Sequence, residues 1–174
     1  EIKEHYQRLR DLSSPRAAEA QERGRTFEHL IFSILHLEKL DPISNFRPTG
    51  EEIDGSFFID GRTVLLEAKW QAKAIPASSI YAFKGKLDGK FHTSSGVFLS
   101  IGPFSDHAEE ALKSGKTLNI LLFEQDDLDL IFRGKAKFTD VLYFKLRQAG
   151  TTGNLKVSFQ KNLEVLDKAL KDEP

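Results

Sequence analysis

The fold is decided by residues 53–70, whose sequence is IDGSFFIDGRTVLLEAKW. Asp60-Gly61 separates two runs rich in aromatic and β-branched residues. In that position Asp-Gly favours a two-residue β-hairpin turn, because both turn residues need positive φ. The turn predicts antiparallel strands at Ile53 to Ile59 and Thr63 to Trp70, and it sets their register.

This register places two carboxylates opposite one another. Counting from Ile59 opposite Arg62 brings Asp54 opposite Glu67, and directly opposed side chains share one face with Cβ atoms about 4.5–5.5 Å apart. Strand alternation adds Lys69 to that face. Two carboxylates about 4 Å apart repel by roughly 4 kcal/mol at an effective dielectric near 20, and a shared divalent cation removes this cost.

A solvated edge hairpin is the alternative interpretation of the two acids and the lysine. Glu67 and Lys69 interrupt the apolar run that begins at Val64, and a buried strand without a function would continue apolar. The local pattern therefore favours a site over a solvated edge.

The other expected elements alternate between helix and strand, which favours a mixed sheet with helices on both faces. Short all-apolar runs suit strands that are buried on both sides. The expected elements are a helix at Arg16 to Leu40, a loop at Asp41 to Gly50, a helix from Pro76 to about Leu87, a strand at Val97 to Ile101, a helix capped by Ser105 and running to Ser114, a strand at Leu118 to Phe123, helices at Asp126 to Phe132 and Thr139 to Gln148, and a tail from Leu155 with both strand-like and helical pieces.

Composition restricts the class of protein. With 40% hydrophobic and 29% charged residues, the chain of 174 residues suits one soluble globular domain. It has no apolar run long enough for a membrane span and no signal-peptide pattern. The absence of cysteine excludes disulfides, thiolate zinc sites and a cysteine nucleophile, so we expect a cytoplasmic location. The chain also lacks methionine, and we expect it to be a piece of a longer protein.

Charge is unevenly distributed although the net charge is only -1. Five lysines lie between residues 69 and 90 against one acid, Asp88, which predicts a contact face for an anion. A solvated helix face is the alternative. Acids are concentrated between residues 105 and 130, where helix ends account for several of them.

A further acid, Glu28, lies at the flank of the apolar stripe on the helix from Arg16 to Leu40. A carboxylate in that position needs a partner. An arginine would serve, and so would a metal ion or its water. His29 and His36 lie on the polar side of the same helix, and we expect them to be solvated rather than to be metal ligands.

Together these residues resemble the Mrr-like branch of the PD-(D/E)xK nuclease superfamily, which also includes archaeal Holliday-junction resolvases. Glu-x-Lys alone occurs by chance in many chains, whereas the combined set is fairly specific. The resemblance covers Arg23 to Phe123 and rests on Phe27-Glu28 in a helix, Gly50-Glu51-Glu52-Ile53-Asp54-Gly55, Leu65-Leu66-Glu67-Ala68-Lys69-Trp70-Gln71, Gly96-Val97-Phe98-Leu99-Ser100, and Phe104-Ser105-Asp106-His107-Ala108 at a helix start.

The resemblance implies a restriction-endonuclease-like α/β/α sandwich with a central mixed β-sheet flanked by helices. It also implies that Asp54, Glu67 and the backbone carbonyl of Ala68 bind Mg²⁺ or Mn²⁺. Lys69 would assist phosphodiester cleavage, and Glu28 would reach the metal directly or through water.

Other positions receive lesser roles from the resemblance. Gln71 is expected to support the site. Glu51 and Glu52 depart from the family's usual loop, which is richer in Gly and Asp, and they are either extra metal contacts or loop charges. The lysines expected to contact DNA phosphates are Lys73, Lys84, Lys86 and Lys90.

The function that the resemblance implies is a metal-dependent endonuclease that hydrolyses double-stranded DNA as a homodimer, in restriction or anti-phage defence. The alternatives are a structure-specific nuclease such as a junction resolvase or nickase, a catalytically inactive nucleic-acid-binding module of the same fold, and a protein-interaction domain. We expect one domain over residues 1–174, with its core at about 23–133, an N-terminal arm or helix at 1–15 and a C-terminal helical extension at 134–174. A sensor or targeting domain would lie outside this segment.

Overall fold

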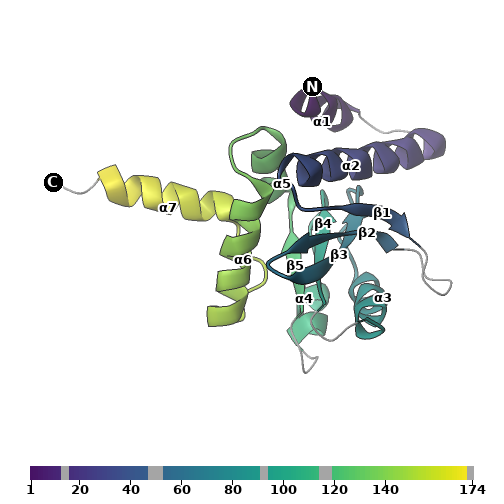
Figure 1. Ribbon diagram of the computed structural model, residues 1–174. Helices are drawn as coiled ribbons and strands as arrows, with labels where there is room; N and C mark the ends of the chain where they lie inside the picture. Colours follow the sequence, from purple (N-terminus) through teal and green to yellow (C-terminus); the bar gives the residue numbers. More distant parts are fainter. Residues whose placement is uncertain (13–15, 47–52, 91–93, 114–118, 172–174) are drawn as a thin grey trace.

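A computed structural model describes residues 1–12, 16–46, 53–90, 94–113 and 119–171 of the chain (Figure 1). Within these residues the helices are α1 Ile2–Asp11, α2 Ala17–Leu37, α3 Ala77–Asp88, α4 Asp106–Lys113, α5 Gln125–Phe132, α6 Phe138–Thr152 and α7 Phe159–Lys171. The strands are β1 Ile43–Phe46, β2 Ile53–Ile59, β3 Arg62–Lys69, β4 Ser95–Ser100 and β5 Ile120–Phe123.

The five strands form one mixed sheet in the order β1-β2-β3-β4-β5. The pairs β1–β2 and β2–β3 are antiparallel, whereas β3–β4 and β4–β5 are parallel. Helix α3 connects β3 to β4, and α4 connects β4 to β5, as parallel neighbours require. The expected mixed sheet is confirmed.

The predicted hairpin is confirmed in turn and register. Asp60 has φ 50° and Gly61 has φ 74°, the left-handed pair that the Asp-Gly turn requires. Ile59 pairs with Arg62, and the ladder continues to Gly55 opposite Leu66. The observed pairing ends at that point, one residue before Asp54 and Glu67, so their direct opposition stays a prediction.

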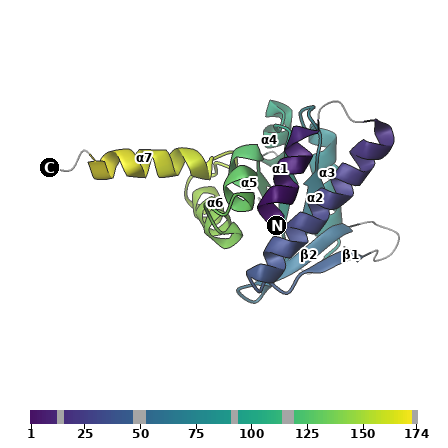
Figure 2. The same cartoon turned by 90° about the horizontal axis from the view of Figure 1, so that it is seen from above.

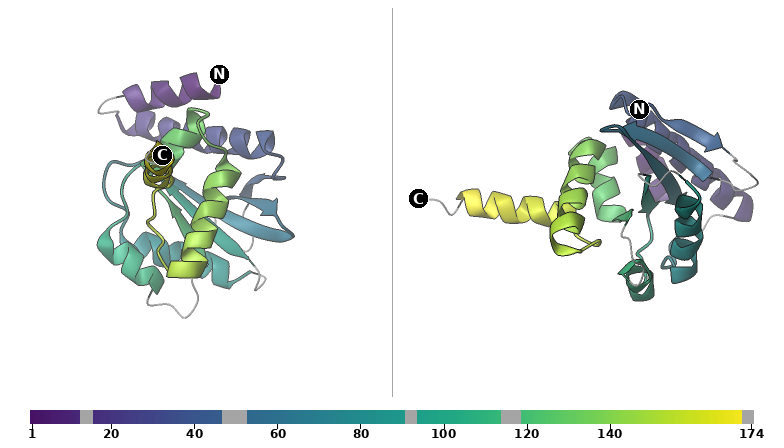
Figure 3. Two further views of the ribbon diagram at one scale, coloured as in Figure 1. Left: turned by 90° about the vertical axis from the view of Figure 1, so that its left-hand side faces the viewer. Right: turned by 60° about the horizontal axis from the view of Figure 1, so that its bottom comes forward.

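Helices cover both faces of the sheet (Figures 2 and 3). One layer contains α1, α2, α5 and α6, and its core includes Phe27, Leu66 and Phe132; we call it the α2 layer. The other contains α3 and α4, and its core includes Phe83 and Phe98; we call it the α3 layer. The observed architecture is therefore the expected α/β/α sandwich.

Two expectations from the sequence were incomplete. Residues 41–50 were expected to form a loop, but Ile43–Phe46 form the edge strand β1, which pairs with β2. A four-residue edge strand in a segment that contains proline leaves little periodic signal. The tail from Leu155 forms helix α7 rather than a mixture of strand and helix.

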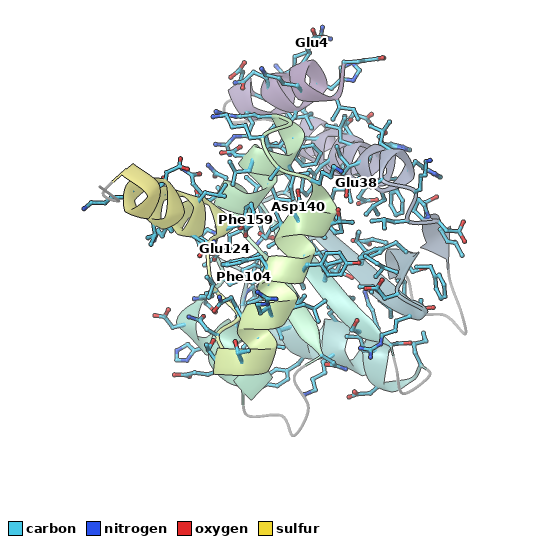
Figure 4. All side chains as sticks on the ribbon, turned by 60° about the vertical axis from the view of Figure 1, so that its left-hand side comes forward. Glu4, Glu38, Phe104, Glu124, Asp140 and Phe159 are labelled. Carbon is cyan, nitrogen blue, oxygen red and sulfur yellow. The ribbon has the colours of Figure 1, made fainter. Side chains whose placement is uncertain are left out.

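The last two helices are attached by buried polar contacts. Glu38, labelled in Figure 4, accepts hydrogen bonds from the N–H groups of Phe138 and Thr139 at 2.6 and 2.9 Å, at the start of α6. Lys145 on α6 forms an ion pair with Asp127 on α5 at 2.8 Å. Helix α7 then projects away from the sandwich (Figure 1).

No helix within the described ranges is both long enough and apolar enough to span a bilayer.

Candidate active site

The predicted acids and lysine lie where the pairing of β2 with β3 ends. Asp54 is half-buried on β2, Glu67 is only 7% exposed on β3, and Lys69 closes β3. An Asp54 carboxylate oxygen accepts a hydrogen bond from the N–H of Ala68 at 2.8 Å, across the two strands. The hairpin therefore brings Asp54 of β2 next to the end of β3.

Glu67 is held between two lysines. One of its carboxylate oxygens lies 2.8 Å from Nζ of Lys69, and the other lies 2.8 Å from Nζ of Lys86 on α3. A buried carboxylate requires such partners. Lys86, which was expected to contact DNA phosphate, here reaches Glu67, because the α3 layer packs against the face of β3 that carries Glu67.

The charged groups of this site shift one another's pKa values. Burial and the neighbouring Glu67 charge raise the pKa of Asp54, and the hydrogen bond from Ala68 only partly offsets them. Burial alone would lower the pKa of Lys69, but the charge and hydrogen bond of Glu67 raise it. Ionised Asp54 beside ionised Glu67 is thus unfavourable without a further cation, while Lys69 stays protonated.

Strand geometry also directs the Ala68 carbonyl toward Asp54. The N–H and C=O of one strand residue point to the same neighbouring strand. Ala68 donates to Asp54 on the β2 side, whereas the carbonyl of the next residue, Lys69, accepts from Ile101 beyond β4. The Ala68 oxygen therefore faces β2 at the level of Asp54.

Glu28 approaches the same site from α2. It lines one groove together with Asp54 and contributes to raising the pKa of Lys69. Gly55 permits this approach, because a Cβ atom there would collide with the Phe32 ring of α2 and the carbonyl of Ile43. The charge of Glu28 thus acts on Lys69, and the choice of an arginine or a metal ion as its partner stays a prediction.

Aromatic packing holds the backbone beside these polar groups. Trp70 follows Lys69 directly, and its ring meets Phe27 edge-on at a centroid distance of 5.1 Å. Phe27 in turn precedes Glu28 on α2. This contact, with Tyr6 against Trp70 at 5.9 Å, orients the end of β3 relative to α2.

One neighbour of the site was not identified from the sequence as functional. Ser100 ends β4, pairs with Lys69 in the sheet and is fully buried. Its hydroxyl makes no hydrogen bond to any residue that the structure describes. A serine at the end of an apolar strand carries no distinctive sequence signal, and only the parallel register places it beside Lys69.

The remaining predicted residues follow β3 or belong to α3 and its end. The amide of Gln71 donates to the carbonyl of Lys73 at 3.0 Å, which turns it toward its own loop. Lys73 is exposed, and Lys84 and Lys90 are partly exposed along α3 and its end. Glu51 and Glu52 lie outside the described residues.

The donor set fits a hard divalent cation. Among the described residues, no group of three or more His, Cys, Asp or Glu side chains could hold a metal ion. The available oxygen donors are two carboxylates, Asp54 and Glu67, with the carbonyl of Ala68. Mg²⁺ typically binds through one or two carboxylates and retains several waters. Such an ion would also relieve the charge conflict that raises the pKa of Asp54.

Two known structures share this fold at TM-scores of 0.50 or above. The small subunit R.BspD6I2 of the heterodimeric restriction endonuclease R.BspD6I aligns over 99% of this chain and 98% of its own, with a TM-score of 0.54 and 14% identity. AF1548, a protein of unknown function, aligns over 83% and 95%, with a TM-score of 0.50 and 17% identity. The restriction endonuclease MspJI in complex with a 27-mer oligonucleotide aligns over 85% and 40%, with a TM-score of 0.46 and 16% identity.

No curated protein matches the chain significantly. The model of the family Mrr_cat, described as restriction endonuclease, matches residues 20–131. That range begins in α2, includes Glu28, Asp54, Glu67 and Lys69, and ends in α5. Because the match extends over more than half of its length, this chain belongs to the Mrr_cat restriction endonuclease family.

Proposed function

We propose that this chain is a divalent-metal-dependent endonuclease that hydrolyses DNA phosphodiester bonds at the Asp54, Glu67 and Lys69 site. The observation that supports this most directly is the convergence of two strands on one point. Asp54 accepts a hydrogen bond from the Ala68 N–H, and a Glu67 carboxylate oxygen lies 2.8 Å from the Lys69 amine. Acids that could bind a cation and an amine that could bind a phosphate thus lie together.

Each residue has a role that follows from its contacts. Asp54, Glu67 and the Ala68 carbonyl would hold Mg²⁺ or Mn²⁺, which when bound supplies Lewis acidity toward phosphate and water. Lys69 keeps its proton because Glu67 raises its pKa. Its ammonium group is therefore suited to donate hydrogen bonds to a phosphate oxygen and to stabilise negative charge that develops there.

Lys86 acts as a positioning residue in this proposal. It occupies the second carboxylate oxygen of Glu67 from α3 and is only 20% exposed. A carboxylate has about four lone-pair sites, so Glu67 can keep a lysine and also bind a cation. Lys86 thereby orients Glu67 without meeting the substrate.

Restriction or anti-phage defence in the cytoplasm, on double-stranded DNA, is the setting we propose. Cutting both strands needs two such sites, and we propose that a homodimer supplies them. A structure-specific nuclease that cuts junctions or nicks one strand remains the second candidate, because the site chemistry is the same for either substrate.

The test is cleavage of supercoiled and linear plasmid DNA with Mg²⁺ or Mn²⁺, with EDTA as the metal-free arm. Cleavage should vanish in EDTA and in Asp54→Ala and Lys69→Ala. Asp88→Ala and Lys161→Ala are matched controls, because both residues are exposed and lie outside the site, and both should cut like the parent chain.

Retained cleavage in both site variants would overturn the proposal. Titration calorimetry with Mn²⁺ tests the alternative of an inactive module. If the module binds no metal through Asp54 and Glu67, the heat of Mn²⁺ binding should not depend on these two residues. A panel of linear, nicked, branched and single-stranded DNA distinguishes the structure-specific nuclease.

A further inference from the structure

A polar groove of about 790 Å³ runs along α2 and contains two of the site acids, Glu28 and Asp54. Its opposite wall includes Ser44 on the edge strand β1. Residues spaced three or four apart on a helix share one face. The α2 wall of the groove includes such a stripe, consisting of Gln21, Arg25, His29, Ser33 and His36.

Every member of this α2 stripe carries a hydrogen-bond donor, and none is an acid. Ser33 already donates to the carbonyl of His29 at 2.9 Å. Arg25 lies 3.8 Å from Glu22, but both side chains are more than 60% exposed, and exposed pairs of this kind hold a side chain weakly. Arg25, His29 and His36 are all exposed, so their donors can reach a ligand in the groove.

A row of donors that leads to Asp54, a proposed metal ligand, and to Glu28 suits a chain of phosphates. Phosphate oxygens accept hydrogen bonds from Arg, from uncharged polar side chains and from backbone N–H groups, and such contacts set the position of a protein on DNA. An acidic peptide would also accept these donors, but it has no phosphodiester bond for the site to cut. A phosphodiester backbone supplies both the acceptors and the bond that the site would cut.

We propose that the α2 stripe holds the backbone of the DNA strand being cut, on both sides of the scissile phosphate. This inference rests on the proposed function. Arg25 and His36 are eleven residues apart in the sequence, or about 16 Å along the helix. Phosphates of one strand are about 3.4 Å apart along the duplex axis. With α2 lying along the duplex axis, the stripe would therefore span about four to five nucleotides.

Glu28 divides this span unequally. It lies three residues after Arg25 and eight before His36, or about 4.5 Å and 12 Å along the helix. Arg25 would contact the backbone about one nucleotide from the cut, and His36 about three to four nucleotides away on the other side. The lysines of α3 lie in the opposite layer, so their contribution can be separated by mutation.

The experiment measures binding of a fluorescein-labelled duplex of mixed sequence by fluorescence anisotropy, over a range of salt concentrations. Asp54→Asn serves as the background, without added metal, so that the duplex stays intact. The test variant adds Arg25→Ala and His36→Ala. The matched control adds Arg8→Ala, an exposed arginine of α1 outside the groove, with Lys84→Ala plus Lys90→Ala as the α3 arm.

The double α2 variant should bind about tenfold more weakly, because hydrogen bonds to charged groups are lost. The slope of log affinity against log salt should also flatten by about one unit, since each phosphate contact contributes about 0.9. Arg8→Ala should stay within about twofold. Arg25→Glu alone should weaken binding more than Arg25→Ala alone, because it reverses the charge.

The inference is overturned if the double α2 variant, with unchanged circular dichroism and melting temperature, binds like the Arg8→Ala control. Loss of binding in the α3 arm with none in the α2 variant would overturn it as well. If the parent chain cuts DNA with Mg²⁺ while the α2 variant behaves like the control, only the groove assignment fails. If the parent neither binds nor cuts DNA, the proposed function fails together with it.

Discussion

Lys145→Met should strongly destabilise the fold. Nζ of Lys145 lies 2.8 Å from Asp127 and 2.9 Å from the carbonyl of Val157, and the two charged side chains are 3% and 2% exposed. Asp127 also accepts the N–H groups of Glu124 and Phe159 at 3.2 and 3.0 Å. The pair thus joins α5, α6 and the start of α7. Methionine keeps most of the lysine volume and removes the charge together with the N–H donors, including the one to Val157.

The magnitude follows from what Lys145→Met leaves behind. Removing one partner of a buried ion pair costs about 3–5 kcal/mol. Because Asp127 keeps two backbone hydrogen bonds, we expect the lower part of that range, about 3–4 kcal/mol. For a chain of this size, each kcal/mol lowers the melting temperature by about 2–4 °C. The expected decrease is therefore about 6–16 °C.

Urea denaturation followed by circular dichroism measures this loss as a lower midpoint at an unchanged m-value. Lys161→Met is the control, because Lys161 is exposed on α7, and its effect should stay within about 0.5 kcal/mol. Adding Asp127→Leu to Lys145→Met should recover part of the loss, since no buried charge remains. A loss below about 1 kcal/mol for Lys145→Met would refute the reasoning, because it is less than leaving one charge buried should cost.

Three further predictions concern the site. Burial and Glu67 raise the pKa of the Asp54 carboxyl, so the metal-free protein loses stability as pH rises through that pKa and Asp54 becomes charged. Asp54→Asn should therefore melt at a higher temperature than the parent chain at neutral pH, and this difference should shrink in acid. A lower melting temperature for Asp54→Asn at neutral pH would contradict this. Gly55→Ala should lower the free energy of unfolding by about 1–3 kcal/mol, because the new Cβ atom collides with Phe32, and it should reduce plasmid cleavage. Gly24→Ala, with open space around it, should stabilise the fold by about 0.5–1 kcal/mol. Equal melting temperatures for the two variants would count against the close approach of α2 to Gly55. Ser100→Ala should stabilise by about 1 kcal/mol in thermal melts, because its buried hydroxyl has no partner among the described residues; a clear destabilisation would mean that the hydroxyl is bonded.

The antiparallel hairpin and its acids could be predicted from the sequence because their cause is local. Asp60-Gly61 specifies a turn whose dihedrals few other pairs adopt, and strand periodicity then sets which side chains face each other. The alternation of apolar runs with helical patterns predicted the mixed sheet for the same reason. The edge strand β1 was missed because four residues beside a proline-containing segment carry almost no periodic signal.

The partners of the site depend on packing between segments that are distant in sequence. No local pattern shows that Lys86 meets Glu67, because that contact requires α3 to cross the sheet on the face that carries Glu67. Nor does one show that His36 and Arg25 line the same groove as Asp54. Hydrogen bonding and side-chain alternation act between near neighbours, and they determined the turn and the paired strands. Burial of apolar surface has no direction of its own, so only the assembled core decided which helix lies over which face and which charges meet there.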